Sequence, residues 1–164
     1  MRRVYNGGKA IRMKIDILQD TLFVIIQMPT DGKEITKNNK YLSIGGGRKI
    51  TNPALKAWYE EAELYHFYHE HQINAWIQRM NCKLYNVRIF WSMKSYRTDA
   101  HNFNEMLLDY LEKLLGINDR NFLPSIVGKE KNSLATVASL WIERHNDVTK
   151  KQFEELARGE NNDI

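Results

Sequence analysis

One stretch of the chain, residues 102–114, constrains the fold more than any other. Its apolar residues recur at intervals of three and four, the spacing that places side chains on one face of an α-helix. These residues are Phe103, Met106, Leu107, Tyr110, Leu111 and Leu114. Such a helix is stable mainly through the burial of its apolar stripe, so the sequence predicts a helix packed on a hydrophobic core.

The other apolar patterns predict a mixed α/β (α+β) fold around this helix. Residues 85–93 alternate apolar and polar, which indicates a strand with one buried face. Further strands are expected at 15–18, 22–28, 121–127 and 133–143, the last with Leu134, Ala138, Leu140 and Ile142 on one face. A long helix is expected from Pro53, either breaking near residue 72 or continuing through 73–80, and a short polar helix at 149–157.

The length of 164 residues favours a single domain over residues 1–164, in which a mixed β-sheet packs with helices. We expect the core at about residues 13–145 and a polar C-terminal helix and tail at 146–164. The single cysteine excludes an internal disulfide and a cysteine-based zinc cluster, which fits a reducing cytoplasm. The longest apolar run, residues 22–26, is too short for a bilayer, and the basic N-terminus lacks the apolar region of a signal peptide, so no membrane association is expected.

Positive charge is concentrated near the N-terminus. Residues 1–50 contain ten Lys and Arg against four Asp and Glu, whereas the rest of the chain is slightly acidic. This asymmetry indicates either a polyanionic partner such as DNA or an ordinary basic surface. The glycine-rich segment 45–51 lacks the spacing of a nucleotide-binding P-loop, so no nucleotide cofactor is expected. It is either a turn whose Arg48 and Lys49 contact a DNA backbone or a plain surface turn.

Three aspartates, Asp99, Asp109 and Asp119, fall ten residues apart around the predicted helix. Asn102, Glu105, Asp109 and Glu112 form a polar stripe opposite the apolar one. These acids either bind a metal ion or form a helix cap, with Asn102 and Glu105 as a capping box, and a solvated face. The helix would separate Asp99 from Asp119 by about 20 Å, so they meet only if the chain doubles back or a second subunit contributes.

The same residues resemble the core of the RusA-type Holliday junction resolvases, a phage- and prophage-associated family. That family has the approximate pattern Asp-x-Asp-Asn-x-x-Lys-x-x-x-Asp-Ala-Leu, followed by a glycine and an Asp-Asp pair. Here Asp99, Asn102, Asp109 and Leu111 match the first part, and Asn118-Asp119 matches the acidic pair. The segment 28–61, with its basic loop, Gly/Arg turn and Lys-Ala-Trp helix, also resembles the family's opening, so the resemblance covers roughly residues 22–143.

This resemblance implies a RusA-like fold and a homodimeric, metal-dependent, structure-selective endonuclease that hydrolyses phosphodiesters at branched DNA in the host-cell cytoplasm. It implies Asp99, Asp109 and Asp119 as catalytic residues, and Asp99, His101, Asp109 and Asp119 as ligands of Mg²⁺ or Mn²⁺. For contacts with branched or duplex DNA we expect the basic side chains of Lys40, Arg48, Lys49, Arg97 and Arg120.

Three positions depart from the family pattern. His101 replaces an aspartate, which shifts the expected metal preference toward Mn²⁺ or another transition ion. Glu105 replaces a lysine, which removes a positive charge but adds a possible ligand, and Asn118 replaces the first acid of the pair. The alternative function is therefore a catalytically impaired RusA-like phage protein that binds DNA or a host protein.

Overall fold

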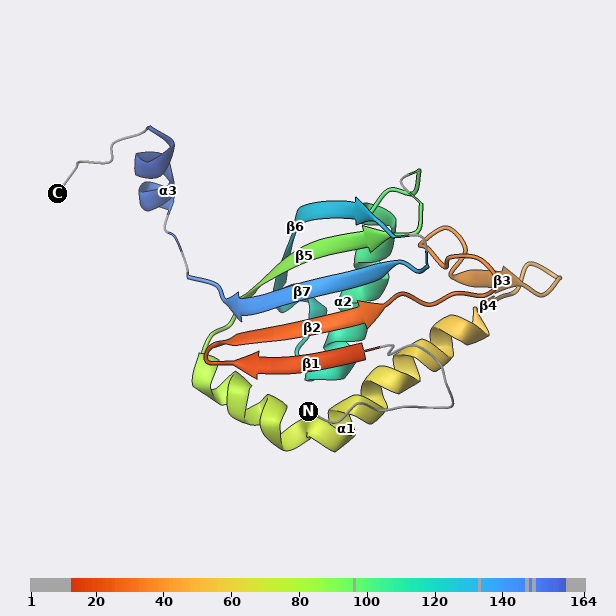
Figure 1. The fold of residues 1–164 in the computed structure, drawn as a ribbon, viewed down its shortest axis with the longest axis horizontal. Coiled ribbons are helices and arrows are strands. Elements are labelled where there is room, and N and C mark those ends of the chain that lie inside the picture. Colours follow the sequence, from red (N-terminus) through yellow and green to blue (C-terminus); the bar gives the residue numbers. More distant parts are fainter. Residues whose placement is uncertain (1–12, 96, 133, 147, 149, 159–164) are drawn as a thin grey trace.

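A computed structural model describes residues 13–95, 97–132, 134–146, 148 and 150–158. Five strands form one mixed sheet in the order β1-β2-β7-β5-β6 (Figure 1). They are β1 (Met13–Leu18), β2 (Thr21–Gln27), β5 (Tyr85–Met93), β6 (Phe122–Lys131) and β7 (Val137–Arg144). The α+β class and the single-domain organisation of the sheet and helices agree with the sequence-based expectation.

The sheet contains antiparallel and parallel pairs for simple topological reasons. β1 and β2 form a hairpin whose two-residue turn begins at Gln19, with a positive φ of 53°. β7 lies between β2 and β5 and pairs antiparallel with both. β5 and β6 are parallel because α2 (His101–Leu115) carries the chain from the end of one to the start of the other.

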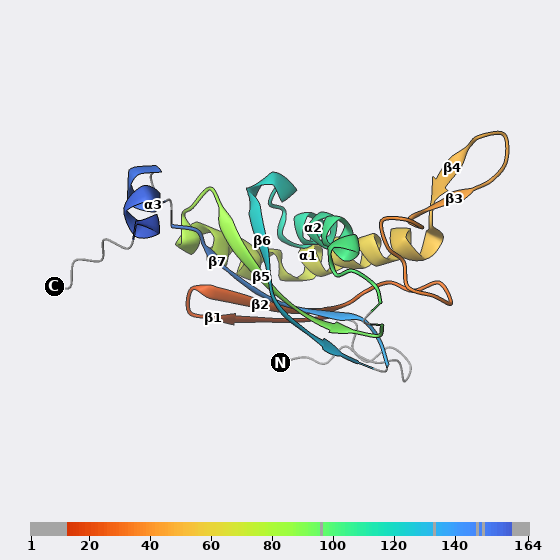
Figure 2. The same cartoon turned by 90° about the horizontal axis from the view of Figure 1, so that it is seen from above.

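Both long helices cover the same face of the sheet (Figure 2). α1 (Pro53–Met80) contributes the buried side chains of Trp58 and Trp76, and α2 contributes its predicted apolar stripe. Phe103, Met106, Tyr110 and Leu114 are at most 1% exposed, so the predicted face of α2 is confirmed. Among the described elements, no helix covers the opposite face of the sheet.

The structure corrects one local prediction and decides between alternatives in two others. α1 does not break near residue 72, because Ile73 and Trp76 continue its buried face. The last strand begins at Val137, and Leu134 lies outside it with 86% of its surface exposed. No capping box forms, because Asn102 lies inside α2 and the N-cap residue, Ala100, has no side-chain cap.

The basic segment predicted to be a loop contains a small two-stranded hairpin, β3 (Tyr41–Ser43) and β4 (Lys49–Thr51). It projects beyond the end of the main sheet, whereas α3 (Lys150–Ala157) lies away from the sheet at the other end (Figure 1). None of the helices in the described part of the chain combines the length and the apolar content that crossing a bilayer requires.

Candidate functional site on helix α2

The start of α2 holds two of the predicted site residues, Asp99 and His101. The Asp99 carboxylate accepts a hydrogen bond from the backbone N–H of His101 at 3.0 Å, which supports the first helical turn. His101 is exposed, and its ring Nδ1 lies 3.4 Å from the side-chain nitrogen of Asn104. These two side chains therefore lie at the N-terminal end of α2, next to the exit from β5.

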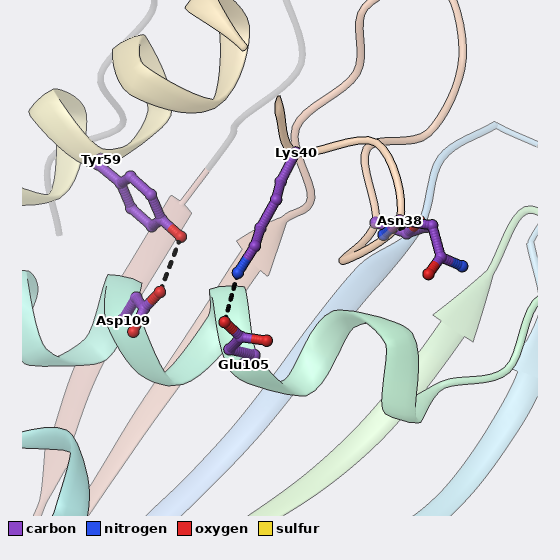
Figure 3. A network of polar contacts seen from close by, with 6 residues as sticks. Asn38, Lys40, Tyr59, Glu105 and Asp109 are labelled. Carbon is purple, nitrogen blue, oxygen red and sulfur yellow. Dashed lines mark hydrogen bonds and ion pairs between the residues drawn. The ribbon is translucent and has the colours of Figure 1, made fainter. Parts of the chain in front are cut away.

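The middle of α2 presents Glu105 and Asp109 toward α1 and the segment that precedes β3 (Figure 3). Lys40 forms an ion pair with Glu105. Tyr59, on the first half of α1, donates a hydrogen bond to the Asp109 carboxylate at 3.2 Å. This face of α2 is thus covered in part by protein donors, rather than forming the fully solvated face that was one of the two expectations.

The electrostatics of Asp109 show that carboxylates crowd on this side of the helix. Burial is the main cause that raises the pKa of Asp109. The nearby charges of Glu105 and Asp119 raise that pKa further, whereas the Tyr59 hydrogen bond and the Lys40 charge oppose the rise. We call Glu105, Asp109 and Asp119 the α2 carboxylate cluster.

The residues that contact this cluster, Lys40 and Tyr59, also have raised pKa values, so each keeps the proton with which it acts as a donor. The hydrogen bond to Glu105 is the largest cause that raises the pKa of Lys40 above its ordinary value, so this ammonium group stays charged. Burial, followed by the charge of Asp109, raises the pKa of Tyr59 and keeps its hydroxyl protonated as a donor. Lys40 and Tyr59 therefore both stabilise negative charge on α2.

Asp119 lies just beyond the C-terminal end of α2, and its charge contributes to the raised pKa of Asp109. The helix ends at Gly116, whose φ of 68° and close approach to the His66 ring both favour glycine. The chain then folds back by about one turn, so that the backbone N–H of Asp119 donates to the Glu112 carboxylate at 3.3 Å. Asp119 begins the short 3₁₀ helix η1 (Asp119–Asn121), which leads directly into β6.

The structure brings some of the predicted ligands together and separates others. α2 has 15 residues, which corresponds to about 22 Å between its ends. Asp99 and His101 lie at one end and Asp119 at the other, so one chain does not gather all four predicted ligands around one ion. Among the described residues, no group of three His, Cys, Asp or Glu side chains is arranged to hold a metal ion.

The predicted DNA-binding residues are also distributed over several places. Arg48 and Lys49 are exposed on the β3–β4 hairpin, and Lys40 lies at its base, where its carbonyl accepts a backbone hydrogen bond from Asn52. Arg97 is exposed near the start of α2 and Arg120 near its end, so these two arginines do not flank one site. Only the hairpin therefore places two of the predicted basic residues next to each other.

Tyr59 is the site residue that sequence reasoning missed. It lies 50 residues before Asp109, and Lys40 lies 65 residues before Glu105. No local spacing predicts either pair, because the packing of α1 and of the preceding loop against α2 brings them together.

The chain matches no protein-family model, and a search of curated proteins finds no match.

Proposed function

We propose that this protein is a metal-dependent, structure-selective DNA endonuclease that resembles the RusA-type resolvases and acts on branched DNA. One observation carries this proposal. Lys40 pairs with Glu105 of the α2 carboxylate cluster, and Lys40 also lies at the start of the β3–β4 hairpin, which carries Arg48 and Lys49. A group of acids suited to phosphodiester chemistry is thus adjacent to a projecting element suited to a phosphate backbone.

The donor chemistry of the cluster fits a hard divalent cation. Glu105, Asp109 and Asp119 offer carboxylate oxygens, the ligands that Mg²⁺ and Mn²⁺ prefer. A bound cation would relieve the like-charge repulsion that helps raise the pKa of Asp109. When bound, it would activate water and neutralise charge on the leaving oxygen. Because Asp99 and His101 lie at the other end of α2, we propose these three carboxylates as the ligand set within one chain. They are not arranged around one ion as described, so Glu105 and Asp109 would have to leave Lys40 and Tyr59 to bind it.

The protein's own residues have separate roles in this proposal. Arg48 and Lys49 bind the DNA backbone and bring the strand toward α2. Tyr59 orients the Asp109 carboxylate, and Lys40 supplies a positive charge beside Glu105. The resembled family has a lysine at the position of Glu105. Here Lys40 brings an ammonium group to that position from a different element.

A second function, DNA or host-protein binding without catalysis, is favoured by a specific observation. Glu105 and Asp109 already have protein partners, Lys40 and Tyr59, which would have to yield to a metal ion. In this alternative, the ion pair and hydrogen bond replace a lost metal and fix the hairpin against α2. We propose that the protein is a homodimer, since a four-way junction has near two-fold symmetry. For either function we propose that it acts in the cytoplasm of a bacterial host.

Incubation with a synthetic four-way junction and with linear duplex tests the two functions directly. The endonuclease proposal predicts cleavage of the junction with Mg²⁺ or Mn²⁺ and none with EDTA. Asp119→Asn should abolish cleavage but leave junction binding intact or stronger, because it removes negative charge near the phosphate. The matched control, Glu60→Gln on the exposed side of α1, should cleave like the wild type. Binding without cleavage under every metal condition would favour the second function.

A further inference from the structure

The face of the sheet that no described helix covers carries exposed apolar side chains on four of its five strands. Ile25 and Trp141 are each 42% exposed, Phe90 is 37% and Leu123 is 38% exposed. These side chains come from four different strands, β2, β7, β5 and β6. Single exposed apolar residues are ordinary, but a set that spans a sheet marks an interaction surface.

The centre of this face is a pair of aromatic rings. Phe23 and Trp141 are directly paired across β2 and β7, and their ring centroids lie 4.7 Å apart in an edge-to-face arrangement. Phe90 lies over Gly128 of β6, where an added Cβ would come within 2.8 Å of its ring. On the other half of the face, Lys14, Asp16, Phe23 and Ile25 help line a hollow of about 250 Å³.

Equal numbers of acidic and basic residues lie on either side of the aromatic pair. The strand register places Asp16, Phe23, Trp141 and Arg88 in one row across four strands. Asp16 pairs with Lys14 at 2.8 Å, and Arg88 pairs with Glu143 at 2.7 Å. Two bases are thus matched by two acids. A DNA backbone would meet carboxylates here, so this face does not suit the polyanion for which the hairpin is suited.

The order of this row makes the face complementary to itself. Strands are about 4.8 Å apart, so Asp16 and Arg88 lie at equal distances on either side of the Phe23–Trp141 pair. A two-fold axis running along the strands, between β2 and β7, would place Asp16 of each copy opposite Arg88 of the other. The same rotation would place Phe23 opposite Trp141, and Phe90 opposite the hollow on the other half of the face.

We propose that a second copy of this chain docks on the open sheet face through this two-fold arrangement. The two sheets pack as a β-sandwich with the aromatic residues at the centre and Asp16–Arg88 pairs at the edge. The contact leaves α2 and the β3–β4 hairpin on the outer sides of the dimer. This proposal identifies the surface of the homodimer and does not require metal binding or DNA cleavage.

Charge reversal tests the arrangement, with the mass in solution measured by sedimentation or light scattering. The wild type should be a dimer. Asp16→Lys alone and Arg88→Glu alone each create two like-charge contacts, so each should weaken self-association by about tenfold or more. An equal mixture of the two variants should dimerise again, because both contacts in a mixed pair join opposite charges. Glu70→Lys, at an exposed position of α1, is the matched control and should remain a dimer.

The mixing step separates the proposal from loss of folding, since misfolded variants would not restore each other. A monomeric wild type would overturn the proposal and leave the face to another occupant. A dimer that both reversals leave unchanged would place the interface elsewhere and overturn it equally. Failure to cleave a junction by a protein that passes the mixing test would count only against the endonuclease function.

Discussion

Replacing Tyr59 with phenylalanine removes one hydroxyl group from the candidate site and nothing else. That hydroxyl donates to Asp109 at 3.2 Å and lies at the packed contact between α1 and α2. A hydrogen bond to a charged group contributes about 1.5–3 kcal/mol to stability. This one is longer than the usual O–H···O⁻ distance, and water can reach the half-buried carboxylate, so we expect a loss of about 1 kcal/mol.

The loss should depend on pH in a defined direction. The Tyr59 hydrogen bond lowers the pKa of Asp109 against the larger effect of burial, so Tyr59→Phe should raise that pKa further. The destabilisation is therefore complete above the pKa of Asp109 in the folded variant, which is the higher of the two, because the carboxylate is then ionised in both proteins. It fades as the pH falls through the pKa of Asp109 in the folded variant and then through the lower, but still raised, pKa in the folded wild type, because both proteins then contain a neutral Asp109 and their unfolded chains titrate alike.

Thermal melts across the acidic range and at neutral pH measure this effect. For a domain of 164 residues, a loss of about 1 kcal/mol lowers Tm by about 2–4 °C. Asp109→Asn and the double variant complete a cycle, which isolates the coupling between the two side chains. Tyr68→Phe, at a 71% exposed position of α1, is the control and should leave Tm unchanged. An equal loss at acid and neutral pH, or an equal loss in the Asp109→Asn background, would refute the reasoning.

Three other outcomes are expected. Met106→Asp should destabilise the protein by more than about 4 kcal/mol in a denaturant titration, because it buries an unpaired charge at a fully buried position; a near-normal midpoint would contradict the packing of α2. Replacing Arg48 and Lys49 together by alanine should weaken DNA binding for all sequences and reduce the slope of log K against log salt by about 2, and an unchanged slope would move the DNA surface elsewhere. Mn²⁺ should raise the Tm of the wild type but not of Asp109→Asn; a rise of equal size in both would place the ion away from the α2 carboxylate cluster.

Local periodicity was enough to predict the elements that build the core. The apolar spacing in residues 102–114 and the alternation in 85–93 each determine one buried face, and both faces are buried in the folded protein. The helix start at Pro53 was also predictable, because the fixed φ of proline suits the first turn of a helix. The predicted start of the last strand was wrong, because the apolar pattern continues to Leu134 although the strand begins at Val137.

The identity of the neighbours on the polar side of α2 was decided only by tertiary structure. The sequence shows that Glu105 and Asp109 share a helix face, but their partners Lys40 and Tyr59 are 65 and 50 residues away. The length of the predicted helix already indicated that Asp99 and Asp119 lie far apart, and α2 separates them by about 22 Å in the folded chain. The spacing of residues along a helix determines which side of the helix each side chain lies on. It does not determine which other elements pack against that side, and a site depends on those elements as well.

The uncovered face of the sheet depends on tertiary structure for the same reason. In β2, apolar residues occupy both faces, so its sequence did not indicate which face the helices would leave open. Strand order then placed Asp16 and Arg88 on either side of Phe23 and Trp141. Strand pairing joins segments more than a hundred residues apart, and periodicity within a strand has no information about which strand becomes its neighbour.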